Sequence, residues 1–179
     1  MTAPERRIPV IQGDSSVSDR YDVIFTTLLG SCVAACIRDP VAKVGGINHF
    51  LLPGVGRDGS PLGAHDTYGA HLMEVLVNGL MQLGASRNRL EAKLFGGAQV
   101  VRGLSDIGRK NAEFAEVYLR YEGIRLLSAD VGGKRGRRVE FWPISGRARV
   151  SYLEDSSVPK EWPEPLPSRP GIGASIELF

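Results

Sequence analysis

The chain has 179 residues, of which 42% are hydrophobic and 23% are charged, and its formal net charge is +2. A chain of this length suits one domain with a core of its own. No apolar run reaches the roughly 18 residues of a membrane-spanning helix, and the N-terminus lacks the apolar core of a signal peptide. We therefore expect a cytoplasmic protein that does not insert into a membrane, and nothing in the charge indicates nucleic acid as a partner.

The N-terminal part is predicted to be a loose segment followed by strands. Residues 1–20 are polar apart from a short apolar patch at Ile8–Ile11, and we expect them to be loose. Runs rich in β-branched and aromatic residues predict three strands, in YDVIFTTLL (21–29), SCVAACIRD (31–39) and VGGINHFLL (44–52). Asp39 and Pro40 provide a turn signal between the second and third of these strands.

The segment after the glycine-rich loop PGVGRDGSPLG (53–63) has the periodicity of a helix. Asp66 or Thr67 can cap its N-terminus, and Gly84 ends it. Its apolar positions are Leu72, Leu76, Leu80 and Leu83.

A second helix is predicted after residue 104. Ser105 or Asp106 can cap it, and Gly123 stops it. Its apolar stripe consists of Ile107, Phe114, Val117, Tyr118 and Tyr121.

Further strands are interleaved with these helices. They are predicted in RLEAKLFGGAQV (89–100), IRLLSADV (124–131), RRVEFWPI (137–144) and GRARVSYL (146–153). The last two flank a short Ser-Gly turn and predict a hairpin. The sequence therefore predicts a mixed α/β architecture, because so many consecutive hairpins do not fit a purely parallel sheet.

The chain changes character at Glu154. Prolines follow at positions 159, 163, 165, 167 and 170, and proline neither donates to a ladder nor fits inside a helix. We expect one domain at 21–153 and an extended, proline-rich tail at 154–179.

The two cysteines, Cys32 and Cys36, are not expected to form a disulfide. Four residues of strand separate their Cα atoms by about 13 Å, whereas a disulfide needs less than about 7 Å. The chain also lacks the Cys and His spacings of a structural zinc site. We expect neither a metal nor a cofactor.

The predicted strand register places Cys32 opposite a histidine. Cys32 and His49 are 17 positions apart, so a hairpin centred between Pro40 and Val41 places them directly opposite each other on one face of the sheet. Directly opposed Cβ atoms lie about 4.5–5.5 Å apart. An imidazole at that distance can take the thiol proton, leaving a thiolate–imidazolium pair that attacks a carbonyl carbon.

The residues before Cys32 fit the same chemistry. A tight turn at Gly30-Ser31 would leave backbone N–H groups beside the sulfur, and an oxyanion intermediate needs such donors. A hydroxyl from Thr26 or Thr27 could orient the histidine. Cys36, which is flanked by apolar residues, is expected to be inert packing.

The stretch TTLLGSCVAACIRDP…GGINHFLLP closely resembles the signature of the chemoreceptor glutamine deamidase family, CheD. The resemblance continues in YGAHLMEVL, EAKLFGGA and IGRKNAEFAEVYLRYEGIRLLSADVGGKRGRRVEF, and it covers roughly Val23 to Leu153. It implies a layered α/β sandwich with mixed, largely antiparallel strands and two main helices, similar to the deamidating domain of cytotoxic necrotising toxins.

The resemblance also implies an activity. Members hydrolyse glutamine side chains on the cytoplasmic helices of methyl-accepting chemotaxis receptors, which is a protein-glutamine glutaminase reaction without a cofactor. The family's nucleophile falls on Cys32, its histidine on His49 and its threonine on Thr26, with Thr27 as the near alternative. Some members also bind a CheC-type phosphatase.

Two rival functions remain open. The same dyad would serve a cysteine protease or an acyltransferase. Alternatively, the fold could be a non-enzymatic adaptor that binds chemoreceptors or the phosphatase. The basic hairpin formed by KRGRRV (134–139), Arg147 and Arg149 is expected to be a solvated face, although it could also contact acidic receptor helices.

Overall fold

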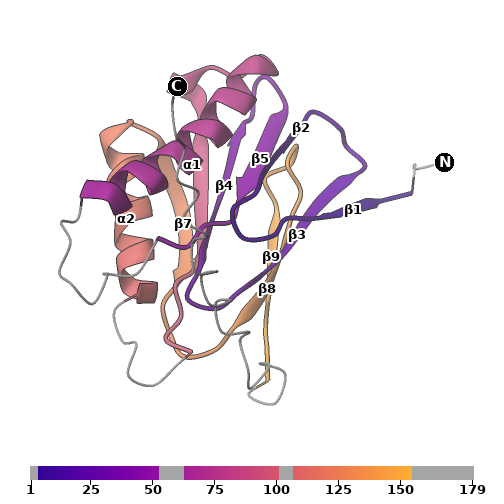
Figure 1. Ribbon diagram of the computed structural model, residues 1–179. Helices are drawn as coiled ribbons and strands as arrows, with labels where there is room; N and C mark the ends of the chain where they lie inside the picture. Colours follow the sequence, from indigo (N-terminus) through magenta and orange to yellow (C-terminus); the bar gives the residue numbers. More distant parts are fainter. Residues whose placement is uncertain (1–3, 53–62, 101–106, 155–179) are drawn as a thin grey trace, which may run out of the picture.

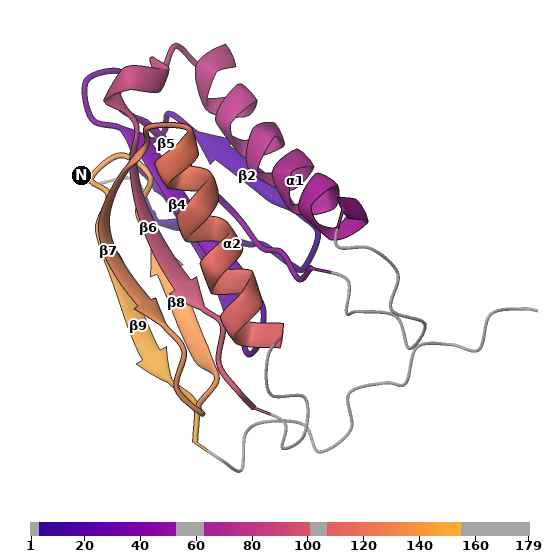
Figure 2. The same cartoon turned by 90° about the vertical axis from the view of Figure 1, so that its left-hand side faces the viewer.

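The protein forms three layers in the computed structural model, which describes residues 4–52, 63–100 and 107–154. One sheet, here called the outer sheet, has the strand order β1-β3-β8-β9, and the other, the central sheet, has the order β2-β5-β4-β6-β7. Two helices lie on the face of the central sheet that is turned away from the outer sheet (Figures 1 and 2). No helix in the described ranges is long and apolar enough to cross a membrane.

The elements follow the order of the sequence. The strands are β1 (Arg6–Pro9), β2 (Ser15–Ser18), β3 (Val23–Leu29), β4 (Val33–Asp39), β5 (Val44–Asn48), β6 (Glu91–Gly96), β7 (Arg125–Val131), β8 (Arg137–Phe141) and β9 (Ala148–Tyr152). The helices are α1 (Gly63–Gln82), the short 3-10 helix η1 (Arg87–Arg89) and α2 (Ile107–Tyr121). The pairs β1–β3 and β6–β7 are parallel and the other strand pairs antiparallel. The predicted α/β fold with mixed strands and two main helices is confirmed.

The unbroken apolar run of β4 is explained by its place in the middle layer. Val33, Ala35 and Ile37 belong to the core between the central sheet and the helices. Ala34 and Cys36 belong to the core between the two sheets. A strand that is covered on both faces has no polar face, so its sequence does not alternate.

Two adjacent glycines in β5 allow close packing on both faces of the central sheet. A Cβ on Gly45 would lie 2.3 Å from the carbonyl oxygen of Pro143 in the β8–β9 turn. A Cβ on Gly46 would lie 2.8 Å from Leu76 Cδ1 of α1. The outer sheet and α1 therefore approach β5 more closely than any side chain would permit.

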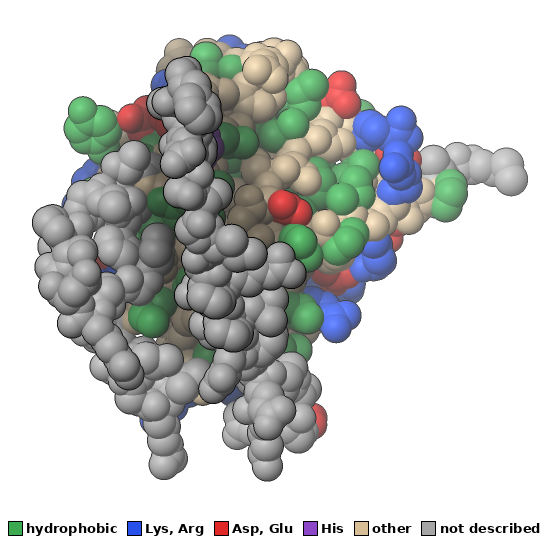
Figure 3. Space-filling view, viewed as in Figure 1, with side chains coloured by type: hydrophobic (Ala, Val, Ile, Leu, Met, Phe, Trp, Pro, Cys, Tyr) green, Lys and Arg blue, Asp and Glu red, His purple; other side chains and the backbone are tan. Residues whose placement is uncertain are grey.

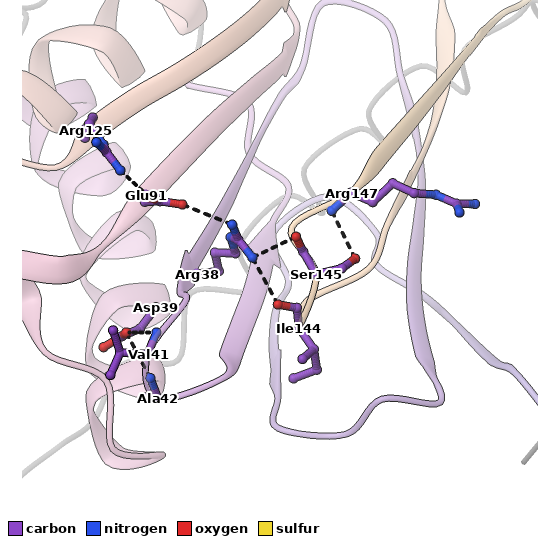
Figure 4. Close-up of polar contacts among 9 residues, drawn as sticks. All are labelled: Arg38, Asp39, Val41, Ala42, Glu91, Arg125, Ile144, Ser145 and Arg147. Carbon is purple, nitrogen blue, oxygen red and sulfur yellow. Dashed lines mark hydrogen bonds and ion pairs between the residues drawn. The ribbon is translucent and has the colours of Figure 1, made fainter. Parts of the chain in front are cut away.

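An arginine at the end of β4 ties the two sheets together (Figure 4). Arg38 Nη1 donates to the carbonyl oxygens of Ser145 at 2.7 Å and Ile144 at 3.1 Å in the β8–β9 turn. Its Nη2 donates to Glu91 at 3.2 Å, and Glu91 also pairs with Arg125 of β7. These bonds fix the end of the sandwich where β4 turns back into β5.

The N-terminal segment differs from the expectation of a loose stretch. Residues 6–9 and 15–18 form β1 and β2, one in each sheet. The segment is polar because both strands lie at sheet edges, where only one side is paired. The tail at 155–179 lies outside the described residues.

The predicted helix boundaries and faces are only partly correct. Helix α1 begins at Gly63, before the expected caps, and Leu83 follows its last residue. Tyr118 is buried and Phe114 packs against the core, as the predicted stripe of α2 requires. Val117 and Tyr121 are 57% and 87% exposed, so the stripe is wrong at these two positions. Small residues contact the sheet instead, because a Cβ on Gly108 would lie 2.5 Å from the carbonyl oxygen of Gly97. The expected α2 caps at 105–106 lie outside the described residues.

Candidate active site

Cys32 lies where the chain crosses from one sheet to the other. Strand β3 ends at Leu29 in the outer sheet, and β4 begins at Val33 in the central sheet. Residues 30–32 make the crossing, and His49 directly follows β5. The Cys32 and His49 side chains are 5% and 6% exposed, so both lie at the edge of the core between the sheets.

The predicted register of β4 and β5 is displaced by two positions. Cys36 pairs with Ile47, and an isolated bridge joins Val33 to Phe50. Cys32 is therefore not directly opposite His49. A shift of two keeps both side chains on the same face, and diagonal neighbours of this kind have Cα atoms roughly 7–8 Å apart.

The protonation of the His49 ring is determined by its neighbours. Nδ1 lies 2.9 Å from Thr27 Oγ1 and 3.3 Å from the Val10 carbonyl oxygen. The Thr27 hydroxyl donates its one proton to the same carbonyl at 2.7 Å. Both contacts at Nδ1 are thus acceptors, so Nδ1 carries the proton and Nε2 carries the lone pair. Nε2 is buried and has no hydrogen-bond partner within the described residues.

The threonine that contacts the histidine is Thr27, the alternative that the sequence analysis placed second to Thr26. Successive residues of a strand point to opposite faces. Thr27 is 5% exposed and faces the core between the sheets, as Phe25 and Leu29 do. Thr26 is more exposed and lies on the other face of the outer sheet, where its backbone pairs with Pro9 and Glu140.

Burial affects the two reactive groups in opposite directions. It raises the pKa of the Cys32 thiol from 9.0 to about 11, although the backbone N–H of Cys32 partly offsets this rise. It lowers the pKa of His49 below 6.5. These shifts favour the neutral form of both groups near pH 7. Cys36 is 1% exposed, and burial raises the pKa of its thiol further.

The carbonyl groups of the crossing all point toward the β6–α2 side. The oxygen of Gly30 accepts from the Ala98 N–H at 2.8 Å, that of Ser31 from Asn111 Nδ2 at 2.8 Å, and that of Cys32 from the Gly97 N–H at 2.7 Å. In a trans peptide the N–H points away from the C=O, and the described residues contain no cis peptide. The N–H groups of Ser31 and Cys32 are therefore directed away from α2, and both can act as donors.

Asn111 of α2, which the sequence analysis did not single out, joins the two halves of the site. It is fully buried. Its Nδ2 donates to the Ser31 carbonyl at 2.8 Å, and its Oδ1 accepts from the Leu52 N–H at 2.9 Å. The segment before Cys32 and the segment after His49 are thus held by one side chain. The sequence signal that could have identified Asn111 is a polar residue on the face of the helix that packs against the sheet.

Asn48, also unrecognised, occupies part of the ladder between β4 and β5. Its Oδ1 accepts from the Ala35 N–H at 2.9 Å, and its Nδ2 lies 3.2 Å from Met73 Sδ. The backbone of the next residue, His49, bonds to the N-terminal segment instead: its N–H donates to Asp14 and its carbonyl accepts from Gly13. The regular backbone hydrogen bonding between β4 and β5 is therefore interrupted next to the site.

His71 is not brought to the site. It is exposed on α1, and the side chain of His65 lies outside the described part. Within that part, no cluster of three His, Cys, Asp or Glu side chains could hold a metal ion.

Comparisons with known proteins agree with one another. The family model CheD, described as CheD chemotactic sensory transduction, matches residues 51–152, a range that begins just after His49. Probable chemoreceptor glutamine deamidases CheD match over nearly their full length. That of Agrobacterium fabrum is 48% identical over 182 residues, covering 100% of this chain and 99% of the relative.

Two further relatives carry the same description. The protein of Rhizobium rhizogenes is 54% identical over 182 residues, with 100% of this chain and 99% of the relative covered. That of Caulobacter vibrioides is 53% identical over 180 residues, with 98% and 96% covered. A solved DUF152-family structure from Neisseria meningitidis is similar only with a TM-score of 0.44 at 12% identity, over 67% of this chain and 53% of that one.

Proposed function

The chain belongs to the CheD family of chemoreceptor glutamine deamidases, and from this premise we propose that Cys32 and His49 perform the hydrolysis of receptor glutamine side chains. The reaction converts a carboxamide and water into a carboxylic acid and ammonia, which are present at neutral pH as a carboxylate and an ammonium ion. Thr27 orients His49, and no metal is required for the steps below.

The contact between Thr27 and His49 carries the proposal. Thr27 Oγ1 lies 2.9 Å from His49 Nδ1, and its hydroxyl proton is already donated to the Val10 carbonyl oxygen. Nε2 is left as a buried base without a partner in the described part of the chain. A histidine that served only packing would have both nitrogens satisfied, so an unpaired Nε2 on the same face as a thiol favours proton transfer.

In the first half of the reaction a thioester forms. The Cys32 sulfur attacks the glutamine Cδ while its proton passes to His49 Nε2. The carbonyl π electrons move to oxygen, and the N–H groups of Ser31 and Cys32 stabilise that oxyanion. The C–N bond then breaks as the imidazolium returns the proton to the nitrogen, and ammonia leaves.

In the second half water replaces the sulfur. His49 Nε2 takes a proton from water, whose oxygen attacks the thioester carbon. The C–S bond breaks, and the sulfur recovers its proton from the imidazolium. The product is a glutamate side chain, and both site residues end in the state in which they began.

Exposed basic side chains are the candidate contact for the cytoplasmic helices of the receptor. In the β8–β9 hairpin and the turn before it, the exposed ones are Lys134, Arg135, Arg138, Arg147 and Arg149. Arg137 is not among them, because it is 1% exposed and pairs with Asp130. Figure 3 shows other Lys and Arg side chains, with a few acidic ones among them, on the side where β1 extends, and β1 is the opposite edge of the outer sheet from β9. A positive face favours an acidic partner. We propose that this partner is the set of cytoplasmic receptor helices, and the proposal requires the enzyme to act in the cytoplasm.

A cysteine comparison tests the assignment. A receptor fragment is incubated with the wild-type protein, with Cys32→Ala and with Cys36→Ala, and amide-to-acid conversion is followed by mass spectrometry. We expect conversion to be lost in Cys32→Ala and retained in Cys36→Ala. Undiminished conversion by Cys32→Ala would exclude Cys32 as the nucleophile. Receptor binding without any conversion by the wild type would favour the adaptor function.

A further inference from the structure

A glutamine from the N-terminal segment lies at the proposed nucleophile. The backbone turns between Ile11 and Asp14, where the Asp14 N–H donates to the Ile11 carbonyl at 3.0 Å. Gly13, at φ +90°, takes the left-handed position of this turn, and Gln12 precedes it. A type II turn has this arrangement, with glycine third.

The backbone of this turn is fixed against the histidine. The Gly13 N–H donates to the His49 carbonyl at 2.7 Å, and the His49 N–H donates to the Asp14 carbonyl at 3.0 Å. These two bonds continue the β2–β5 ladder, in which Ser15 pairs with Asn48. The turn therefore cannot move away without breaking the ladder that also holds His49.

The side chain of Gln12 reaches back to the sulfur. Cys32 Sγ donates to Gln12 Oε1 at 3.4 Å, although Gln12 itself is an exposed residue. The group in contact with the thiol is a primary carboxamide on a glutamine, which is the chemical group that the proposed reaction consumes.

We propose that Gln12 is an internal occupant of the subsite for the substrate carboxamide, which leaves the subsite by side-chain rotation when a receptor glutamine enters. This inference rests on the proposed role of Cys32 and names the pocket in which the substrate amide binds. The Gln12 side chain competes with the substrate for the subsite, and it protects the Cys32 sulfur while no substrate is bound.

The resting contact is unproductive for chemistry on Gln12. The thiol presents its proton to Oε1, whereas attack needs the sulfur lone pair directed at Cδ and the proton on His49. A hydrogen bond from the neutral thiol also disfavours its ionisation. Gln12 therefore stays an amide.

The occupant is also easy to displace. An S–H group is a weak donor, and an exposed glutamine with several rotatable bonds gains rotamer entropy when it is released. Only the side chain has to move, because the backbone bonds of Gly13 and Asp14 remain.

Alkylation of Cys32 by iodoacetamide tests the occupancy without a receptor. The rate at Cys32 is measured by peptide mass spectrometry in the wild type, Gln12→Ala, Gln12→Met and the control Ile11→Ala, whose side chain is 66% exposed in the same turn. We expect roughly two- to fivefold faster alkylation in both Gln12 variants, as the loss of one weak hydrogen bond implies. Ile11→Ala should match the wild type. With a receptor fragment, Gln12→Ala should show a lower KM and a smaller change in kcat.

Three results would overturn the proposal. The first is an unchanged rate in Gln12→Ala. The second is protection by Gln12→Met equal to that of the wild type, which would make the contact simple steric cover. The third is Cys32-dependent conversion of Gln12 to glutamate, which would make Gln12 a substrate. A wild-type protein that alkylates as expected but leaves receptor unconverted would instead contradict the proposed function.

Discussion

The hydroxyl of Thr27 joins His49 to the backbone of the N-terminal segment, because its Oγ1 lies 2.9 Å from Nδ1 and 2.7 Å from the Val10 carbonyl oxygen. The one hydroxyl proton goes to the carbonyl, so the imidazole must donate from Nδ1. This leaves Nε2 as the proton acceptor. The Val10 carbonyl, which is far from His49 in sequence, thereby determines which ring nitrogen keeps the lone pair.

Removal of this hydroxyl should slow the chemical step. In Thr27→Val the ring keeps only the longer bond from Nδ1 to Val10, at 3.3 Å. The loss of about one hydrogen bond, roughly 1.4 kcal/mol, corresponds to about a tenfold fall in kcat. Steady-state kinetics on a receptor fragment measure it, and Thr27→Ser should restore most of the rate.

Thr26→Val is the matched control for that substitution. Its side chain lies on the opposite face of β3 and is only partly buried, so we expect kcat near the wild-type value. A larger loss in Thr26→Val than in Thr27→Val would return the orienting role to Thr26 and contradict the assignment made from the geometry.

The sequence predicted the elements around the site better than their register. The turn signal at Asp39-Pro40 placed the β4–β5 hairpin, but its centre lies further along the chain, since Arg38 pairs with Gly45. Asp39 accounts for part of the difference: its carboxylate accepts from the N–H groups of Val41 and Ala42 at 2.9 and 3.0 Å and so extends the turn. A displacement of two positions leaves Cys32 and His49 on the same face of the sheet, although they are not directly opposite each other as predicted.

Contacts between segments distant in sequence could not be predicted. Gln12 and Asn111 reach Cys32 and Ser31 across 20 and 80 positions, and no local periodicity encodes such distances. Whether Thr26 or Thr27 contacts His49 depends on which face of β3 is directed toward the core between the two sheets. The β3 sequence VIFTTLL does not alternate between apolar and polar residues, so it does not indicate that face.

Asn111→Ala should reduce both stability and turnover. It leaves the Ser31 carbonyl and the Leu52 N–H without their partner, and each unsatisfied buried group costs about 1–3 kcal/mol. Urea unfolding measures the fall in the free energy of unfolding, and kcat reports the loss of alignment. The control Asn78→Ala, at an exposed position of α1, should change neither. Normal kcat in folded Asn111→Ala would show that the side chain supports stability alone.

The activity should fall on the acidic side of neutrality. Burial lowers the pKa of His49 below 6.5, so the base stays neutral at pH 7 and kcat/KM should be constant there. As the pH falls below 6.5 the imidazole takes a proton and can no longer accept one from Cys32, so kcat/KM falls. A pH profile on a receptor fragment measures this limb. A midpoint well above 6.5 would indicate a thiolate–imidazolium pair at rest instead.

The pH dependence of Cys32 alkylation tests the resting state of the thiol on the alkaline side. Burial raises the pKa of Cys32 to about 11, so its alkylation rate should still rise between pH 8 and pH 10, each unit adding about tenfold more thiolate. Cys36 serves as an internal control, because it is 1% exposed and should be labelled only after unfolding. A rate at Cys32 that levels off near neutral pH would contradict the neutral resting state.

Gly96→Ala should disrupt the support of Cys32. Gly96 has φ +107°, and a Cβ there would lie 2.1 Å from the Cys32 carbonyl oxygen. Gly84 has φ +97° with nothing within 4 Å of its Cβ position, so Gly84→Ala carries the backbone strain alone, roughly 1–2 kcal/mol.

The difference between these two alanine variants in urea unfolding isolates the contact with Cys32. We expect Gly96→Ala to lose clearly more stability than Gly84→Ala, because the Cys32 carbonyl has to move and its bond from the Gly97 N–H, at 2.7 Å, is lost with it. The same movement turns the adjacent N–H groups away from the oxyanion position, so the soluble fraction of Gly96→Ala should also lose turnover. Equal stability of the two variants would show that the crossing at residues 30–32 can move freely, and rigid donors for an oxyanion could then not be placed there.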